Sequence, residues 1–116
     1  MWINPIDYES HVLSEFLAYD TIQVSERVRK KHGITIRDIE KACRNIIQYA
    51  TRWSDDYNMV IHAVAGNIHT SLDSTRQLQI LANLVTDENG LHVFKVWHAL
   101  DLTEKMAREL RLRRVR

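Results

Sequence analysis

The sequence predicts an α+β fold, with helices packed on a small antiparallel sheet and a basic helix at the C-terminus. Three observations lead to this prediction. Thr35 begins a capping-box motif that opens an apolar stripe, which indicates a helix. Asn89-Gly90 joins two apolar segments, which is the strongest short signal of a β-hairpin. Thr103 begins a last segment that is rich in arginine.

A length of 116 residues, with 45% hydrophobic and 27% charged residues, is typical of one globular domain spanning 1–116. The sequence has no apolar run long enough to cross a bilayer and no signal-peptide pattern, so we expect no membrane partner. The single cysteine, Cys43, rules out an internal disulfide framework and favours a reducing, cytoplasmic location. No glycine-rich phosphate loop is present, and His62 and His69 lack a third ligand at matching spacing. We therefore expect neither a cofactor nor a metal.

The N-terminal segment allows two interpretations. Asn4-Pro5 suggests a turn that leads into a helix over about 5–17. A short strand over 16–19 is the alternative.

Two helices are predicted next. Asp20 is a suitable N-cap for a helix over about 20–31, and Gly33 suits the left-handed position beyond its end. Thr35 and Asp38 then match the capping-box pattern of a second helix. Its core-facing stripe consists of Ile36, Ile39, Cys43, Ile46 and Ile47, and its solvent side carries Arg37, Lys41 and Arg44.

A strand is predicted over 48–53, and the segment after it is ambiguous. Ser54, followed by two aspartates, favours a helix start. Helical spacing continues through Tyr57, Ile61, Val64, Ile68 and Leu72, although Gly66 interrupts it. A strand over 59–65 is the alternative, because that run is rich in β-branched residues. A loop is expected over 72–75.

The hairpin strands are predicted over 77–86 and 91–100. With Asn89-Gly90 as a two-residue loop, Val85 pairs with Phe94, Asn83 with Val96 and Leu81 with His98. Both faces of the hairpin are largely apolar, which predicts that it lies inside a larger sheet. The last helix is expected from 102 to about 115.

Charge is unevenly distributed along the chain. Acidic residues predominate in 1–20 and 54–94, and basic residues in 21–53 and 95–116. Two basic segments that merged in the fold would attract phosphate. On separate faces, they would serve solubility alone.

Two stretches resemble a known family. Arg29-Lys30-Lys31-His32-Gly33-Ile34 is similar to the R-K-H-G-[VI] corner of BrnT-type toxins, small ribonucleases of bacterial toxin–antitoxin pairs in the RelE-like group. The stretch from His98 to Lys105 resembles their S-A-R-x-x-T-x-x-E segment, with His98 in place of the serine and Leu100 in place of the arginine. The resemblance implies a small α+β fold, metal-independent RNA cleavage and an antitoxin protein as partner.

Cleavage of RNA through its 2′-hydroxyl requires proton transfer and cations near the developing phosphorane charge. The catalytic candidates are Lys31, His32 and His98, and the nucleic-acid-binding candidates are Arg27, Lys30, Lys95, Arg108 and Arg111. Trp2, Trp53 and Trp97 are candidates for stacking on unpaired bases, with core packing as the alternative. The nuclease hypothesis supposes that the corner at Lys31, the hairpin and the terminal arginines converge on one electropositive hollow.

Purely structural roles compete with these assignments. Cations at a helix C-terminus satisfy its free carbonyls, His98 is a candidate for a hydrogen-bonded core histidine, and surface arginines keep a protein soluble. Because strand side chains alternate, Lys95 and His98 are expected on opposite faces. A non-catalytic partner-binding relative, suggested by Leu100, and a nucleic-acid-binding regulator without cleavage are the alternative functions.

Overall fold

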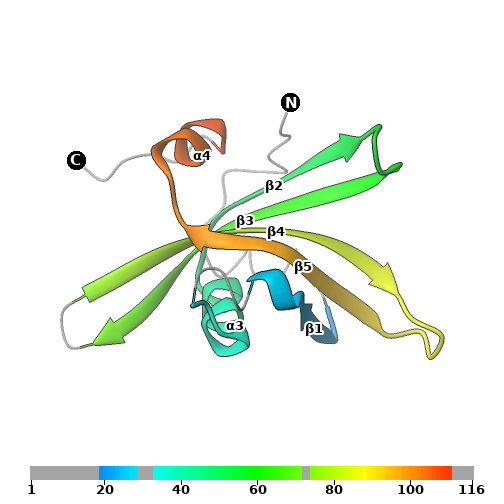
Figure 1. Cartoon of the computed structure of the whole chain (residues 1–116), viewed down its shortest axis with the longest axis horizontal. Helices are drawn as coiled ribbons and strands as arrows, with labels where there is room; N and C mark the ends of the chain where they lie inside the picture. Colours follow the sequence, from blue (N-terminus) through cyan, green and yellow to red (C-terminus); the bar gives the residue numbers. More distant parts are fainter. Residues whose placement is uncertain (1–18, 29–32, 72–73, 111–116) are drawn as a thin grey trace.

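A twisted sheet organises the chain, and a computed structural model describes residues 19–28, 33–71 and 74–110 (Figure 1). Its elements are β1 (Thr21–Val24), α3 (Ile36–Arg44), β2 (Ile46–Ser54), β3 (Met59–Ser71), β4 (Ser74–Thr86), β5 (His92–Asp101) and α4 (Glu104–Glu109). These residues form a five-stranded sheet in the order β1-β5-β4-β3-β2. β1 runs parallel to β5, and the other neighbours are antiparallel. The architecture is therefore α+β, but the sheet is mixed rather than antiparallel throughout.

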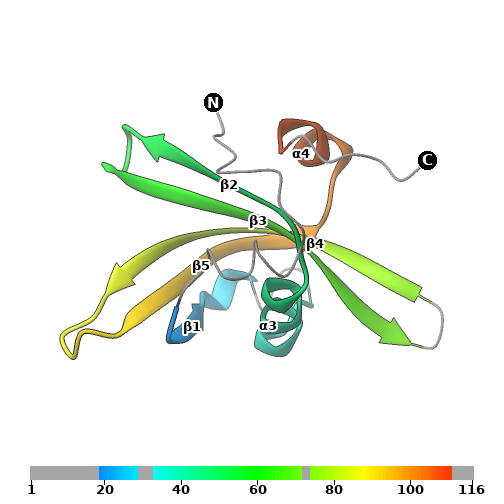
Figure 2. The ribbon, with the colours of Figure 1, turned by 180° about the vertical axis from the view of Figure 1, so that it is seen from behind.

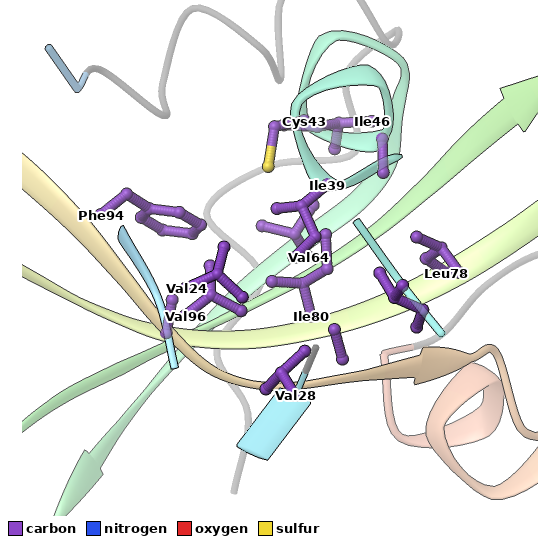
Figure 3. Packing of buried hydrophobic residues seen from close by; sticks show 14 of the residues in the cluster. Val24, Val28, Ile39, Cys43, Ile46, Val64, Leu78, Ile80, Phe94 and Val96 are labelled. Atoms are coloured by element: carbon purple, nitrogen blue, oxygen red, sulfur yellow. The ribbon is translucent and has the colours of Figure 1, made fainter. Parts of the chain in front are cut away.

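The two faces of the sheet carry different helices. Figures 1 and 2 show α3 on one side of the sheet and α4 on the other. On the α3 face, buried residues of β1, β3, β4 and β5 pack with Ile34 and with Ile39, Ala42 and Cys43 of that helix (Figure 3). On the α4 face, a smaller cluster joins Leu110 and Met106 to the sheet, and its strand residues are Ile47, Ala50, Ile61, Ala63, Ala65 and Leu81.

Helix α3 forms as predicted at its N-terminus. The backbone N–H of Asp38 donates to Thr35 Oγ1 at 3.1 Å, and the Thr35 N–H donates to Asp38 Oδ2 at 3.1 Å. The helix ends at Arg44 with Asn45 as its C-cap. Ile46 and Ile47, which were expected to continue the helical stripe, therefore belong to β2, where Ile46 is still buried.

Helix α3 approaches β3 very closely at Gly66. A Cβ atom added to Gly66 would overlap the backbone carbonyl of Ala42. The Asn67 N–H donates to the Asn45 carbonyl at 3.0 Å beside this contact. The glycine in β3 is thus required by packing, because any side chain there would push the helix away.

The predicted helix over 20–31 is wrong. Thr21–Val24 forms strand β1, and within the described part of this predicted helix, 20–28, only residues 26–28 are helical. Asp20 anchors this strand instead of capping a helix, because its N–H donates to the His92 carbonyl at 2.8 Å and its carboxylate accepts from the His92 N–H at 2.7 Å. Gly33 does have the predicted left-handed backbone, with φ +62°.

The favoured helix after Ser54 is also wrong, and the strand alternative is correct. β3 lies inside the sheet and is covered on both faces, with Ile61 and Ala63 on the α4 face and Val64 on the α3 face. A strand covered on both faces carries consecutive apolar residues, and such a run also contains positions at helical spacing. Ser54 Oγ accepts from the Tyr57 N–H at 3.3 Å and so starts a turn.

The hairpin of β4 and β5 is confirmed, with a different register near its loop. Asp87 Oδ1 accepts from the N–H groups of Asn89 and Leu91 at 2.8 and 2.9 Å, and Gly90 has φ +80°. The Asp87 N–H donates to the Leu91 carbonyl at 2.9 Å. The loop therefore holds three residues instead of two. As a result, Val85 pairs with Val93 and Asn83 with Lys95, each one residue from the prediction, while Leu81 pairs with His98 as predicted.

The predicted start of the last helix is correct, because Thr103 Oγ1 accepts from the Met106 N–H at 3.1 Å as the N-cap of α4. β4 begins at Ser74, inside the predicted loop. The helix over 5–17, the alternative strand over 16–19 except Tyr19, and the end of the last helix at 111–116 lie outside the described residues; Tyr19 itself is not part of a strand.

Candidate functional site

A bulge in β5 brings two predicted site residues to one face. Ala82 pairs with Val96 and Leu81 with His98, so Trp97 is an extra residue on β5. Because Leu81 and Asn83 lie two positions apart on β4, their partners His98 and Lys95 share a face, with Cα atoms of the two β4 residues about 7 Å apart. Leu81 belongs to the α4-side cluster, which identifies that face. The expectation that Lys95 and His98 lie on opposite faces is wrong, since it assumed an uninterrupted strand.

His98 is held by a part-buried polar network centred on Gln79. The Nε2 atoms of His98 and Gln79 lie 3.1 Å apart. Gln79 is only 5% exposed, and its Oε1 accepts from the N–H of Thr103 at 2.9 Å and from the Thr103 hydroxyl at 3.1 Å. The same side chain therefore anchors the start of α4 and orients the imidazole of β5.

This network fixes which nitrogen of His98 accepts. The backbone N–H of Thr103 can only donate, so the Gln79 atom facing it is the carbonyl oxygen and the other atom is the amide nitrogen. That amide nitrogen donates to His98 Nε2, which must then be unprotonated. The neutral ring in this arrangement carries its proton on Nδ1.

Among the described residues, two strand positions on the α4 face carry cations. Lys95 is exposed, and Arg52 pairs with Ile61 of the α4-side cluster and so shares its face. Helix α4 adds exposed Lys105 and Arg108 together with Glu104 and Glu109. The described part of this helix is therefore charge-balanced, and Arg111 lies outside the described residues.

An apolar pocket of about 240 Å³ lies on the α4 face, and one of its lining residues, Asn83, pairs with Lys95. It is lined by Tyr57, Met59, Ile61, Asn83 and Trp97. Tyr57 and Trp97 remain 70% and 39% exposed. Asn83 Nδ2 donates to the Val60 carbonyl at 2.9 Å, which fixes the orientation of the amide.

The sequence indicated only Trp97 among these lining residues. Asn83 lies on β4, whose predicted register was wrong near the loop. Ile61 lies on β3, which was predicted as a helix, and Tyr57 lies in the turn that was predicted to begin that helix. Tyr57 stands between Asp56 and Asn58 in the sequence, and an aromatic residue within such a polar run was the signal that could have identified it as a surface residue.

The remaining predicted residues do not join this face. Arg27 is exposed beside Val28, which is buried in the α3-side cluster. Lys30, Lys31 and His32 lie outside the described residues. Of the predicted site, the structure places Lys95, His98 and the helix of Arg108 on the same face of the sheet, whereas Arg27 belongs to the segment on the other side.

A second histidine site, which the sequence did not predict, lies on the α3 face. The Tyr49 hydroxyl and His62 Nδ1 are hydrogen-bonded, and the His62 ring also packs edge-on to Phe94 with 6.3 Å between ring centroids. Burial lowers the pKa of His62 from its usual 6.5 and raises the pKa of Tyr49 to about 12. These groups are neutral near pH 7, which suits a structural role.

The described residues contain no cluster of three or more His, Cys, Asp or Glu side chains that could hold a metal ion. Within the same part of the chain, no helix is long and apolar enough to cross a membrane.

No protein family, curated protein or solved structure matches this chain in the comparisons with known proteins.

Proposed function

We propose that this protein binds single-stranded RNA on its α4 face and acts as a ribonuclease of the toxin type that its sequence resembles. The observation that supports this most is the bulge at Trp97, which gathers Lys95, Trp97 and His98 on one face of β5. A continuous strand would have turned Lys95 and His98 away from each other.

The chemistry of this face suits a single strand of RNA. Lys95 and the α4 cations Lys105 and Arg108 offer positive charge for phosphates, and binding by such contacts releases condensed counterions. The exposed rings of Trp97 and Tyr57 offer surfaces on which unpaired bases stack. Double-stranded RNA would keep its bases away from both rings.

Cleavage would proceed by attack of a 2′-hydroxyl oxygen on the adjacent phosphorus while the bond from phosphorus to the 5′-oxygen breaks; the 2′-hydroxyl gives up its proton and the leaving 5′-oxygen takes one up. Nδ1 of the neutral ring already carries a proton, so His98 would accept the 2′-hydroxyl proton at Nε2 after releasing the Gln79 amide, and the resulting imidazolium would protonate the 5′-oxygen. Leu100 is half-buried and uncharged where the family has arginine, so Lys95 and Arg108 would have to stabilise the phosphorane charge. The protein would act in the cytoplasm, where an antitoxin would bind it and block this face.

The experiment is incubation of the purified protein with single-stranded RNA at neutral pH in the presence of a metal chelator. We expect fragments that end in 2′,3′-cyclic phosphates. His98→Ala should slow cleavage by roughly 10²-fold or more, as loss of a positioned proton-transfer group does. Arg37→Ala is the matched control, because Arg37 is an exposed cation of α3 on the other side of the sheet. Intact RNA with wild-type protein, or equal rates for both variants, would contradict the nuclease proposal.

A second candidate is RNA binding or partner binding without cleavage. The part-buried Gln79–His98 contact and the uncharged Leu100 favour it, because both remove groups that the chemistry needs. In that case, the protein would bind RNA with an affinity that falls steeply with salt and would leave the RNA intact. Lys95→Ala should then reduce the salt dependence, while co-purification with the product of the adjacent gene would identify an antitoxin partner.

A further inference from the structure

The pocket beside the β5 bulge leaves two of its lining aromatic side chains partly in solvent. Its walls are apolar, yet Tyr57 and Trp97 leave much of their ring area in solvent instead of packing into the α4-side cluster. Two large aromatic side chains at the mouth of one pocket expose surface that a flat ring would cover.

Two pocket residues, Asn83 and Ile61, each pair with a cationic residue of a neighbouring strand. Asn83 pairs with Lys95 on one side, and Arg52 pairs with Ile61 of the pocket wall on the other. An occupant of the pocket therefore lies between two strand positions that carry cations. This arrangement favours a flat apolar group attached to an anionic backbone over an apolar side chain of a neutral peptide.

Asn83 adds a polar contact inside the pocket. Its Nδ2 donates to the Val60 carbonyl, so Oδ1 is the atom left to accept a hydrogen bond from an occupant. Every nucleobase carries an N–H donor on its Watson–Crick edge, which an amide oxygen satisfies.

We propose that this pocket binds one unpaired nucleobase, stacked against Trp97 with Tyr57 at its rim, while Lys95 contacts the adjoining phosphate. This inference rests on the proposed RNA binding and adds to it the place where a base is held. The pocket makes the α4 face selective for single strands, because a paired base cannot enter it.

The test uses a fluorescently labelled, 2′-O-methylated oligonucleotide, which lacks the attacking hydroxyl, and a matched oligonucleotide with abasic sugars. Binding is measured by anisotropy at low salt. We expect the abasic probe to bind more weakly than the base-containing probe. Trp97→Ala should weaken binding of the base-containing probe by roughly 5- to 100-fold and leave binding of the abasic probe unchanged.

Two further variants separate the possible failures. Tyr57 lies in an exposed turn, so the Tyr57→Ala variant should keep the fold and weaken binding of the base-containing probe alone. Trp53→Ala is the control. Trp53 is 55% exposed and pairs with Val60. Because Ile61, next to Val60, faces α4, the Trp53 ring points to the other face of the sheet. Lys95→Ala should weaken binding of both probes.

Equal affinity of the wild type for both probes, or an unchanged affinity in Trp97→Ala and Tyr57→Ala, would overturn the base pocket and leave RNA binding by charge intact. Failure of the wild type to bind either probe would overturn the proposed function together with the pocket.

Discussion

The Nε2 atoms of Gln79 and His98 lie 3.1 Å apart within the α4 face, and they join the middle strand of the sheet to its bulged neighbour. The opposite end of the Gln79 amide accepts two hydrogen bonds from Thr103. One buried amide thus determines both where α4 begins and how His98 is oriented.

This geometry predicts the tautomer of His98. In the wild type at alkaline pH, the ring should carry its proton on Nδ1, because Gln79 can only donate to Nε2. In Gln79→Glu, the carboxylate accepts instead, so the proton should move to Nε2. Long-range ¹H–¹⁵N correlation spectra distinguish the two forms. The exposed His92 is the internal control, and an Nε2-protonated His98 in the wild type would contradict the assigned network.

Gly66→Ala should destabilise the fold by about 1–3 kcal/mol, because the added methyl group meets the Ala42 carbonyl and helix α3 must shift. Denaturant unfolding monitored by circular dichroism gives the free energy. Gly33→Ala and Gly90→Ala are the comparison, since both glycines have positive φ and open space where the added Cβ atom would lie. The free energy of unfolding of these two variants should fall by only about 1 kcal/mol, which is the cost of a left-handed backbone for a residue with a side chain. A loss at Gly66 no larger than theirs would argue against the close approach.

Burial of His62 predicts a specific loss of stability in acid. Its pKa is lowered in the folded protein, so the unfolded chain binds the proton more readily. The contribution of His62 is complete above about pH 6.5 and is lost as the pH falls below that value toward the folded pKa. Unfolding free energies measured between pH 7.5 and 5 should fall less steeply in His62→Gln. Identical slopes for wild type and His62→Gln would exclude this role.

Cys43 should react slowly with alkylating reagents at pH 8. Burial raises the pKa of its thiol to about 12, and the thiolate is the reactive form. The half-time of iodoacetamide labelling, followed by mass spectrometry, should shorten by orders of magnitude in denaturant. Labelling of the folded protein as fast as a free thiol would show that the sheet does not cover this side chain of α3.

Local side-chain chemistry made some elements predictable. Thr35 and Asp38 form a capping box with each other, three residues apart, and no distant residue is needed to complete it. The hairpin at Asn89-Gly90 was likewise visible, but Asp87 lengthened its loop by accepting two backbone hydrogen bonds, and this shifted the nearby register by one residue.

Features that depend on distant partners were not predictable. Thr21–Val24 becomes a strand because β5 lies beside it, and β3 resembled a helix because both of its faces are covered. For the candidate site, the residue types at Lys95 and His98 were recognised, whereas their common face depends on a bulge that only the cross-strand pairing with Leu81 and Ala82 reveals.

The parallel pairing of β1 with β5 also has a kinetic consequence. Strands β2 to β5 follow one another along the chain, so their pairings close short loops, while Asp20 meets His92 across 72 residues. Closing that long loop costs more chain entropy and yields only four residue pairs. We expect the meander to assemble first and β1 to dock late, which makes the amide protons of β1 the first to exchange with solvent in the native protein.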